Sequence, residues 1–256
     1  MALTATELLD GVRDTYQAVG RDLEHDVRGL GQVGAAQSRA EGHVFGKHEH
    51  VRGLVRAQLS NQRPWGPIAD NLDASESIFH GFELGYLRTA DPASLTSGLL
   101  SLRCGNRQVR HQMAALKANI AVFDRIEVDY GDVDAFVTSD SPERIAWSVA
   151  EGNTYKLRQI GLTLALEYLK NVGLDAGKPD DHVRCILGPG RLAYFKHDPL
   201  EMEAALEVKR PAAEAGTSAT YMDNVLWLFC ARDYGGVCGA APRGHLCELR
   251  SACASG

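Results

Sequence analysis

The chain has 256 residues, of which 45% are hydrophobic and 23% charged, and its formal net charge is −6. This length can bury one large core or two smaller ones, and the composition excludes disordered, collagen-like and low-complexity classes. The acidic balance argues against a protein that coats nucleic acid by bulk charge. No long apolar run and no basic-then-apolar start occurs, which predicts a cytoplasmic protein with no membrane segment and no secretory signal.

Apolar residues recur with helical spacing along most of the chain, whereas strand signals are short and few. A first helix is predicted after Thr4 or Thr6, with apolar positions Leu8, Leu9, Val12 and Tyr16. A second, which Pro64 must terminate, carries Val51, Leu54, Val55 and Leu59. A third carries Met113, Leu116, Ile120 and Phe123. We therefore expect an all-α protein.

The clearest apolar face runs from Leu162 to Val172, and Gly173 is expected to end that helix in the left-handed conformation. A Gly- and Pro-bearing break over 173–179 follows, and a new helix is predicted to begin at Asp180 or Asp181. We place a domain boundary at this break.

Two features favour no particular function by themselves. The His43, His48, Glu49 and His50 cluster matches no standard pair of helix ligands, so we interpret it as a surface feature. Residues 103–120 carry Arg103, Arg107, Arg110 and Lys117 with no acid, whereas 124–143 are strongly acidic. The two segments form either opposite solvated faces or a surface with one DNA-facing side.

Four of the six cysteines, Cys230, Cys238, Cys247 and Cys253, fall within the last 27 residues. Without an export signal, such clustering favours metal binding or buried thiols over disulfides. The segment resembles the iron–sulfur cluster loop of the endonuclease III branch of the helix-hairpin-helix (HhH-GPD) DNA glycosylases, which spaces four cysteines with six, two and five residues between them. Cys247 and Cys253 keep the last spacing, and Cys238 opens the loop.

The cysteine loop departs from the family pattern at its second ligand. Gly244 stands there, and the first spacing is one residue short. Three states are open: a [4Fe-4S] cluster held by the three cysteines, with an exchangeable corner or with His245 or Cys230 as fourth ligand; a zinc site; or a loop without metal.

Two further segments resemble the family's DNA-contacting motifs. Leu59-Ser60-Asn61-Gln62 is similar to its leucine-serine-any-glutamine segment, which implies Asn61 and Gln62 as DNA contacts, with Gln62 filling the gap left by an extruded base. Residues 152–161 stand where the family has a glycine-rich hairpin that holds a phosphate, which implies contacts from Lys156, Arg158 and Gly161. Solvated polar residues flanking buried helices are the alternative reading of both segments.

Lys178-Pro179-Asp180-Asp181-His182-Val183-Arg184 is similar to the family's proline, aspartate, any residue, histidine, valine pattern. The resemblance implies a catalytic carboxylate at one of the two aspartates. Counting back from His182 selects Asp180, whereas counting forward from Pro179 selects Asp181. The resemblance also implies that His182 and Arg184 lie near DNA. Such a carboxylate can stabilise an oxocarbenium-like sugar and orient the attacking water. Alternatively, the aspartate only caps a helix.

Family members that also cut the strand carry a lysine near the start of the helix after the hairpin, because an amine must form a Schiff base with the sugar. Gly161 or Leu162 occupies that place, so abasic-site lyase activity is not expected unless Lys156 or Lys170 reaches the sugar.

The resemblance implies two helical domains with a cleft between them. One is a helical barrel with the hairpin over 46–174, and the other combines 1–45 with 175–256 and carries the aspartate and the cysteine loop. It implies a monomeric base-excision enzyme, nucleoid-associated if bacterial, that hydrolyses the N-glycosidic bond of a flipped damaged or mispaired base in double-stranded DNA. A non-catalytic DNA-binding relative and an iron–sulfur-dependent regulator are the alternatives.

Overall fold

The computed structural model describes residues 3–239 and 241–254, and every regular element in them is a helix. The predicted all-α class is therefore confirmed. Across these described ranges, no helix is both long and apolar enough to cross a membrane. The contacts between helices divide the chain into two units, one formed by Met1–Gly34 with Asp175–Gly256 and the other by Ala35–Leu174.

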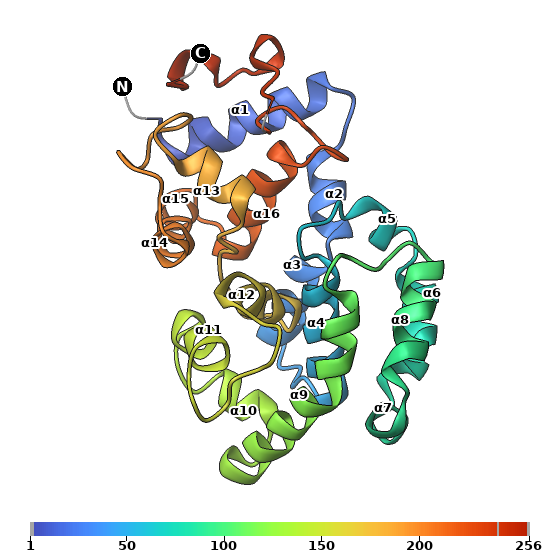
Figure 1. Ribbon diagram of the computed structural model, residues 1–256. Coiled ribbons are helices and arrows are strands. Elements are labelled where there is room, and N and C mark those ends of the chain that lie inside the picture. Colours follow the sequence, from blue (N-terminus) through green and yellow to red (C-terminus); the bar gives the residue numbers. More distant parts are fainter. Residues whose placement is uncertain (1–2, 240, 255–256) are drawn as a thin grey trace. The chain divides into compact units, whose positions relative to one another are not determined.

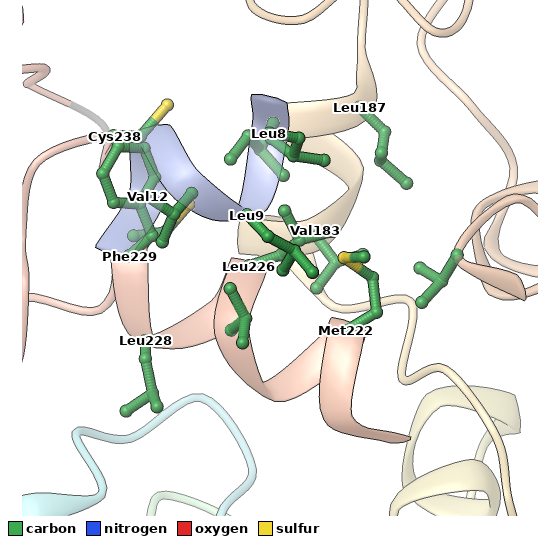
Figure 2. Close-up of a cluster of buried hydrophobic side chains, with 14 of the residues drawn as sticks. Leu8, Leu9, Val12, Val183, Leu187, Met222, Leu226, Leu228, Phe229 and Cys238 are labelled. Carbon is green, nitrogen blue, oxygen red and sulfur yellow. The ribbon is translucent and has the colours of Figure 1, made fainter. Parts of the chain in front are cut away.

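The unit that contains both ends of the chain is built around one apolar helix, α16. Its helices are α1 (Ala5–Ala18), α2 (Leu23–Gly29), α13 (Asp181–Leu187), α14 (Glu201–Glu207), α15 (Lys209–Glu214), α16 (Ala219–Cys230) and the 3-10 turns η2 (Gly244–Leu246) and η3 (Arg250–Ala252). Helix α16 contacts α1, α2, α13 and α15, so its buried side chains meet those of all four. The resulting core includes Leu8, Val12, Val183, Met222, Phe229 and Cys238 (Figure 2).

The second unit is a set of helices packed around α4, α9 and α12. Its elements are α3 (Gln32–Ala40, which begins just before the unit), α4 (Lys47–Leu59), α5 (Gly66–Ala69), α6 (Leu72–Ile78), η1 (His80–Phe82), α7 (Leu84–Thr89), α8 (Pro92–Ser101), α9 (Val109–Tyr130), α10 (Val133–Val137), α11 (Pro142–Ala150) and α12 (Leu162–Asn171). Helix α12 packs against α4 and α11, and α9 packs against α8, α10 and α4 (Figure 1).

The helix ends follow local side-chain chemistry. Thr4 caps α1 through a reciprocal pair of hydrogen bonds with Glu7, in which Thr4 Oγ1 accepts from Glu7 N at 3.2 Å and Glu7 Oε2 accepts from Thr4 N at 2.8 Å. Gly173 follows α12 with φ +78°, as its predicted left-handed conformation requires. Helix α4 ends at Leu59, ahead of Pro64, because the chain already turns at Ser60 and Asn61.

The first change of unit lies between Gly34 and Ala35, not between 45 and 46 as predicted. Residues 35–45 belong to the second unit because Arg39 binds inside it. The guanidinium of Arg39 donates to both carboxylate oxygens of Asp134 at 2.6 and 3.0 Å, and to the carbonyl oxygen of Val172 at 2.7 and 3.0 Å. The second change of unit lies between Leu174 and Asp175.

The surface interpretation of the histidine cluster is wrong for His50, whose exposed fraction is 0%. Its Nε2 lies 3.2 Å from Asp134 Oδ1, and its Nδ1 lies 2.7 Å from the Tyr168 hydroxyl. Because an ionised carboxylate only accepts hydrogen bonds, Nε2 donates to Asp134. Burial, followed by the charge of Asp134, raises the pKa of Tyr168 well above its ordinary value, so its hydroxyl stays protonated and can donate to Nδ1. His50 thus joins α4 to α10 and α12.

Candidate active site and nucleic-acid interface

Asp180 occupies the N-cap of α13, as the capping alternative predicted. Its Oδ1 accepts hydrogen bonds from the backbone N–H groups of His182 at 3.0 Å and Val183 at 3.1 Å. The side chain of Asp180 is only half-buried, so these bonds fix its direction without removing it from solvent. An N-cap role and a catalytic role are compatible, because both use an oriented, ionised carboxylate.

The segment that leads to Asp180 is fastened to α16 by buried polar side chains. Asp223, which is 1% exposed, accepts from the backbone N–H of Lys178 at 2.8 Å. Thr220 Oγ1 accepts from Ala176 N at 3.2 Å, and Asp175 Oδ1 accepts from Thr220 N at 2.8 Å. These contacts hold 175–178 against the N-terminal half of α16 and thereby position Asp180. The sequence motifs did not indicate Thr220 or Asp223.

The other residues of the aspartate motif differ in their surroundings. Asp181 is exposed in the first turn of α13. The ring of His182 meets that of Trp227 edge to face, with centroids 6.3 Å apart, and both rings are half-buried. Arg184 is also half-buried, and its Nε donates to the carbonyl oxygen of Pro199 at 2.8 Å. Of the two candidate carboxylates, Asp180 is the one whose orientation is fixed.

The residues named as metal ligands lie in different surroundings. In residues 3–239 and 241–254, no three His, Cys, Asp or Glu side chains are grouped so that they could hold an ion. Cys230 and Cys238 are a buried pair: a hydrogen bond from the Cys230 thiol lowers the pKa of Cys238, and the same contact, together with burial, raises the pKa of Cys230 well above its ordinary value. His245 is exposed.

Cys247 and Cys253 are both half-buried. Burial is the main reason that the pKa of Cys247 is raised, and the nearby Cys238 and Cys253 raise it further. The three loop cysteines are thus neighbours, but Gly244 brings no fourth donor. A [4Fe-4S] cluster held by cysteines alone would need one more thiolate than these three supply.

The cysteine loop is instead fixed by contacts of its own. Thr15 Oγ1 accepts from Glu248 N at 3.0 Å, and the buried side chain of Leu249 lies over Gly11. A Cβ at Gly11 would stand 2.3 Å from Leu249 Cδ2, so only glycine leaves room for this leucine. Ala254 N donates to the carbonyl oxygen of Arg191 at 2.8 Å. These contacts attach the loop to α1 and to Arg191.

This arrangement predicts that metal removal leaves the fold intact. Protein purified without oxygen should contain much less than one iron or zinc per chain, and dialysis against a strong chelator should leave its thermal unfolding midpoint unchanged. Metal analysis and melting curves on the same sample check this. Stoichiometric iron with acid-labile sulfide, together with a lower midpoint after its removal, would contradict it, since a metal that holds a fold contributes its binding energy to stability.

In the other unit, Asn61 and Gln62 lie in the turn after α4. Gln62 is exposed and has φ +49°, a left-handed conformation that is costly for a residue with a side chain. Arg63 fastens this turn by donating to the carbonyl oxygens of Gly105, at 2.5 Å, and of Arg103. The turn therefore exposes the side chain of Gln62 to solvent, while the hydrogen bonds of Arg63 fix the backbone next to it.

Two buried glutamines lie beneath this turn, and the sequence motifs did not indicate them. Gln58 and Gln112 are both 0% exposed, and Gln112 Nε2 donates to the Gln58 carbonyl oxygen at 3.2 Å. In the part of the chain that the structure describes, both side-chain polar atoms of Gln58 and the Oε1 of Gln112 have no hydrogen-bond partner. The end of α4, four residues before Gln62, thus contacts a second buried amide side chain from α9.

The hairpin residues are exposed and carry charge. Lys156 Nζ lies 3.5 Å from Glu151 Oε2, an ion pair whose side chains are both about half exposed. Arg158 and Gly161 are exposed as well. Gly161 is the N-cap of α12 and offers no side-chain cap, so the N–H groups of the first turn of α12 receive no hydrogen bond from it. Asp180, His182 and Arg184 belong to one unit, and Asn61, Gln62 and these hairpin residues belong to the other.

Comparison with solved structures finds the same fold in the 8-oxoguanine DNA glycosylase of Thermotoga maritima. The TM-score is 0.57 at 17% sequence identity, over 88% of this chain and 96% of that one. No family model and no curated protein matches the sequence. The chain therefore shares the fold of that glycosylase, in agreement with the all-α fold expected from the sequence.

Proposed function

We propose that the protein is a monofunctional DNA glycosylase that hydrolyses the N-glycosidic bond of a damaged or mispaired base. The observation that carries this proposal is the oriented, half-buried Asp180 at the start of α13 in a fold shared with a DNA glycosylase. An enzyme that acts on this bond must take the nucleotide out of the stack. Gln62, on its exposed left-handed turn, is suited to fill the space that the base leaves.

In the proposed reaction, Asp180 acts through its carboxylate. Its carboxylate stabilises the positive charge that develops on the sugar as the base departs, and orients the water that attacks the anomeric carbon. The bond from that carbon to the base nitrogen breaks and a bond to the water oxygen forms. One proton of the water passes, by way of solvent, to the departing base, and the other stays on the new hydroxyl group of the sugar. No step passes through a metal.

DNA binding is supported by charge on the second unit. Arg103, Arg107 and Arg110 are exposed, and none forms an ion pair with another of the described residues. Arg103 and Gly105 are held to the Gln62 turn through Arg63. These arginines can neutralise phosphates next to the inserted glutamine, which explains how a chain of net charge −6 can bind DNA.

The proposal excludes strand cleavage through a Schiff base. Gly161 and Leu162 have no amine, and Lys170, at 1% exposed, is buried in the second unit. Lys156 is the one hairpin lysine, and it already pairs with Glu151. Without an amine at the sugar, hydrolysis leaves an abasic site in an intact strand.

A single-turnover assay tests the proposal. Duplexes that carry one altered base are incubated with excess protein, beginning with 8-oxoguanine opposite cytosine because the protein of like fold acts on that base. We expect release of free base by mass spectrometry, and strand breaks only after alkali. Breaks without alkali would contradict the monofunctional assignment. Tight binding to an abasic-site analogue with no base released from any duplex would favour the non-catalytic relative.

A further inference from the structure

The hairpin that precedes α12 is fastened to α9 by one buried amide. Asn119, which is 0% exposed, lies in the middle of α9. Its Oδ1 accepts from the backbone N–H of Arg158 at 2.7 Å, and its Nδ2 donates to the carbonyl oxygen of the same residue at 3.1 Å. Both backbone polar groups of Arg158 are thus held by a single side chain from a helix 39 residues away in sequence.

Two exposed contacts continue the attachment along α9. Arg125 donates to the carbonyl oxygen of Thr154 at 3.1 Å, and the Tyr155 hydroxyl donates to Asp129 Oδ2 at 2.9 Å. Exposed hydrogen bonds of this kind compete with water and contribute little to stability. The buried bonds of Asn119 are therefore the ones that fix the backbone.

The position of this attachment matters because the chain turns sharply just after it. Gln159 has φ +61°, a conformation that costs a residue with a side chain about 1 kcal/mol or more. Two residues later Gly161 begins α12 without a side-chain cap. Because Asn119 holds both the N–H and the carbonyl group of Arg158, it restrains the backbone directly before Gln159 and keeps Gln159 in this conformation.

We propose that Asn119 is a positioning residue for DNA binding. It holds the hairpin in the shape in which the exposed side chain of Arg158 contacts a DNA phosphate. This inference rests on the proposed function, because it assigns a DNA phosphate as the ligand. Asn119 itself, buried beneath Arg158, does not touch DNA. Replacing Asn119 by an apolar side chain would leave the N–H and carbonyl groups of Arg158 without these partners.

The test compares Asn119→Ala with Asn171→Ala. Asn171 also uses its amide to hold a backbone carbonyl, that of Gly53 at 3.0 Å, in the same unit but away from the hairpin. Two quantities are measured for each variant: amide hydrogen exchange over 157–164 without DNA, and the Kd for a duplex that carries a tetrahydrofuran abasic analogue, as a function of salt. Asn119→Asp, which keeps the acceptor for Arg158 N–H, replaces the alanine variant if that one does not fold.

We expect Asn119→Ala to accelerate exchange in the hairpin alone, to weaken DNA binding about tenfold, and to lower the slope of log Kd against log salt by about 1, as for one lost phosphate contact. Asn171→Ala should change neither the hairpin exchange nor the slope. Equal loss of affinity in both variants, or unchanged hairpin exchange in Asn119→Ala, overturns the assignment. If the unaltered protein binds no duplex at low salt, the proposed function and the positioning role both fall, and exchange alone then shows whether Asn119 orders the hairpin.

Discussion

Replacing Asp180 by Asn should slow base release by about 10²–10⁴-fold while leaving the protein folded. The neutral amide can still accept the hydrogen bonds from the N–H groups of His182 and Val183, because Asn is as good an N-cap as Asp. It cannot offset the positive charge that develops on the sugar. Single-turnover assays should show the lower rate of base release, and binding titrations on the same preparation should show nearly unchanged affinity for the abasic analogue.

Asp181→Asn is the matched control, because it makes the same chemical change one residue along the chain, at an exposed side chain. We expect its rate to stay within a few-fold of the unaltered protein. A loss of rate in Asp181→Asn with none in Asp180→Asn would show that the carboxylate is the one counted from Pro179. Equal, unchanged rates in both variants would remove either aspartate from the chemistry.

Asp180→Ala separates the two roles of the side chain. Alanine cannot cap α13, so this variant should lose about 1 kcal/mol of stability in addition to its activity. If Asp180→Asn and Asp180→Ala lower the rate equally but differ in their thermal unfolding midpoints, the activity depends on the charge of Asp180 and the stability depends on its cap.

The sequence predicted the features that depend on near neighbours. The Thr4 cap needs only Glu7 three residues on, and the left-handed Gly173 needs only the end of its own helix. The cap at Asp180 is likewise local, since its partners are the next two N–H groups of α13. Both partners of such a contact lie within a few residues of each other, so short sequence motifs were enough to predict the helical class and these helix ends.

The features that the sequence missed depend on partners far along the chain. His50 can be buried because both of its ring nitrogens are hydrogen-bonded, one to Asp134 and one to Tyr168, which lie 84 and 118 residues away in sequence. No local pattern around His50 indicates them. The clustering of cysteines near the C-terminus does not by itself indicate which thiol contacts Cys230; in the structure Cys230 forms a hydrogen bond with Cys238.

The buried group of Arg39, His50 and Asp134 carries the largest stability effect that we predict. Asp134 is 5% exposed, so its carboxylate is largely shielded from solvent. Burial alone would raise the pKa of Asp134, but hydrogen bonds from His50 and Arg39 outweigh burial and lower it to about 2. Asp134→Ala leaves the Arg39 guanidinium in a largely buried place without its carboxylate. We expect the free energy of unfolding to fall by about 3–5 kcal/mol in urea titrations at neutral pH.

The control is Asp140→Asn, which breaks an Asp–Arg pair with Arg144 whose side chains are 44% and 78% exposed. Solvent screens that pair, so its loss should cost less than about 1 kcal/mol. Equal costs in the two variants would show that burial does not strengthen the Asp134 contacts.

The pH dependence of stability follows from the lowered pKa of Asp134. A carboxyl group whose pKa is lower in the folded than in the unfolded chain stabilises the fold. The stabilisation is complete above the pKa of the unfolded chain, near 4, and is lost as the pH falls toward the pKa of the folded chain, about 2. Asp134→Asn removes this titration without emptying the site. The stability advantage of the unaltered protein over Asp134→Asn should therefore be constant from about pH 5 to 7 and shrink between about pH 4 and 2. An advantage that grows on acidification would mean that Asp134 is protonated in the folded protein, and that Arg39 is held mainly by the carbonyl oxygen of Val172.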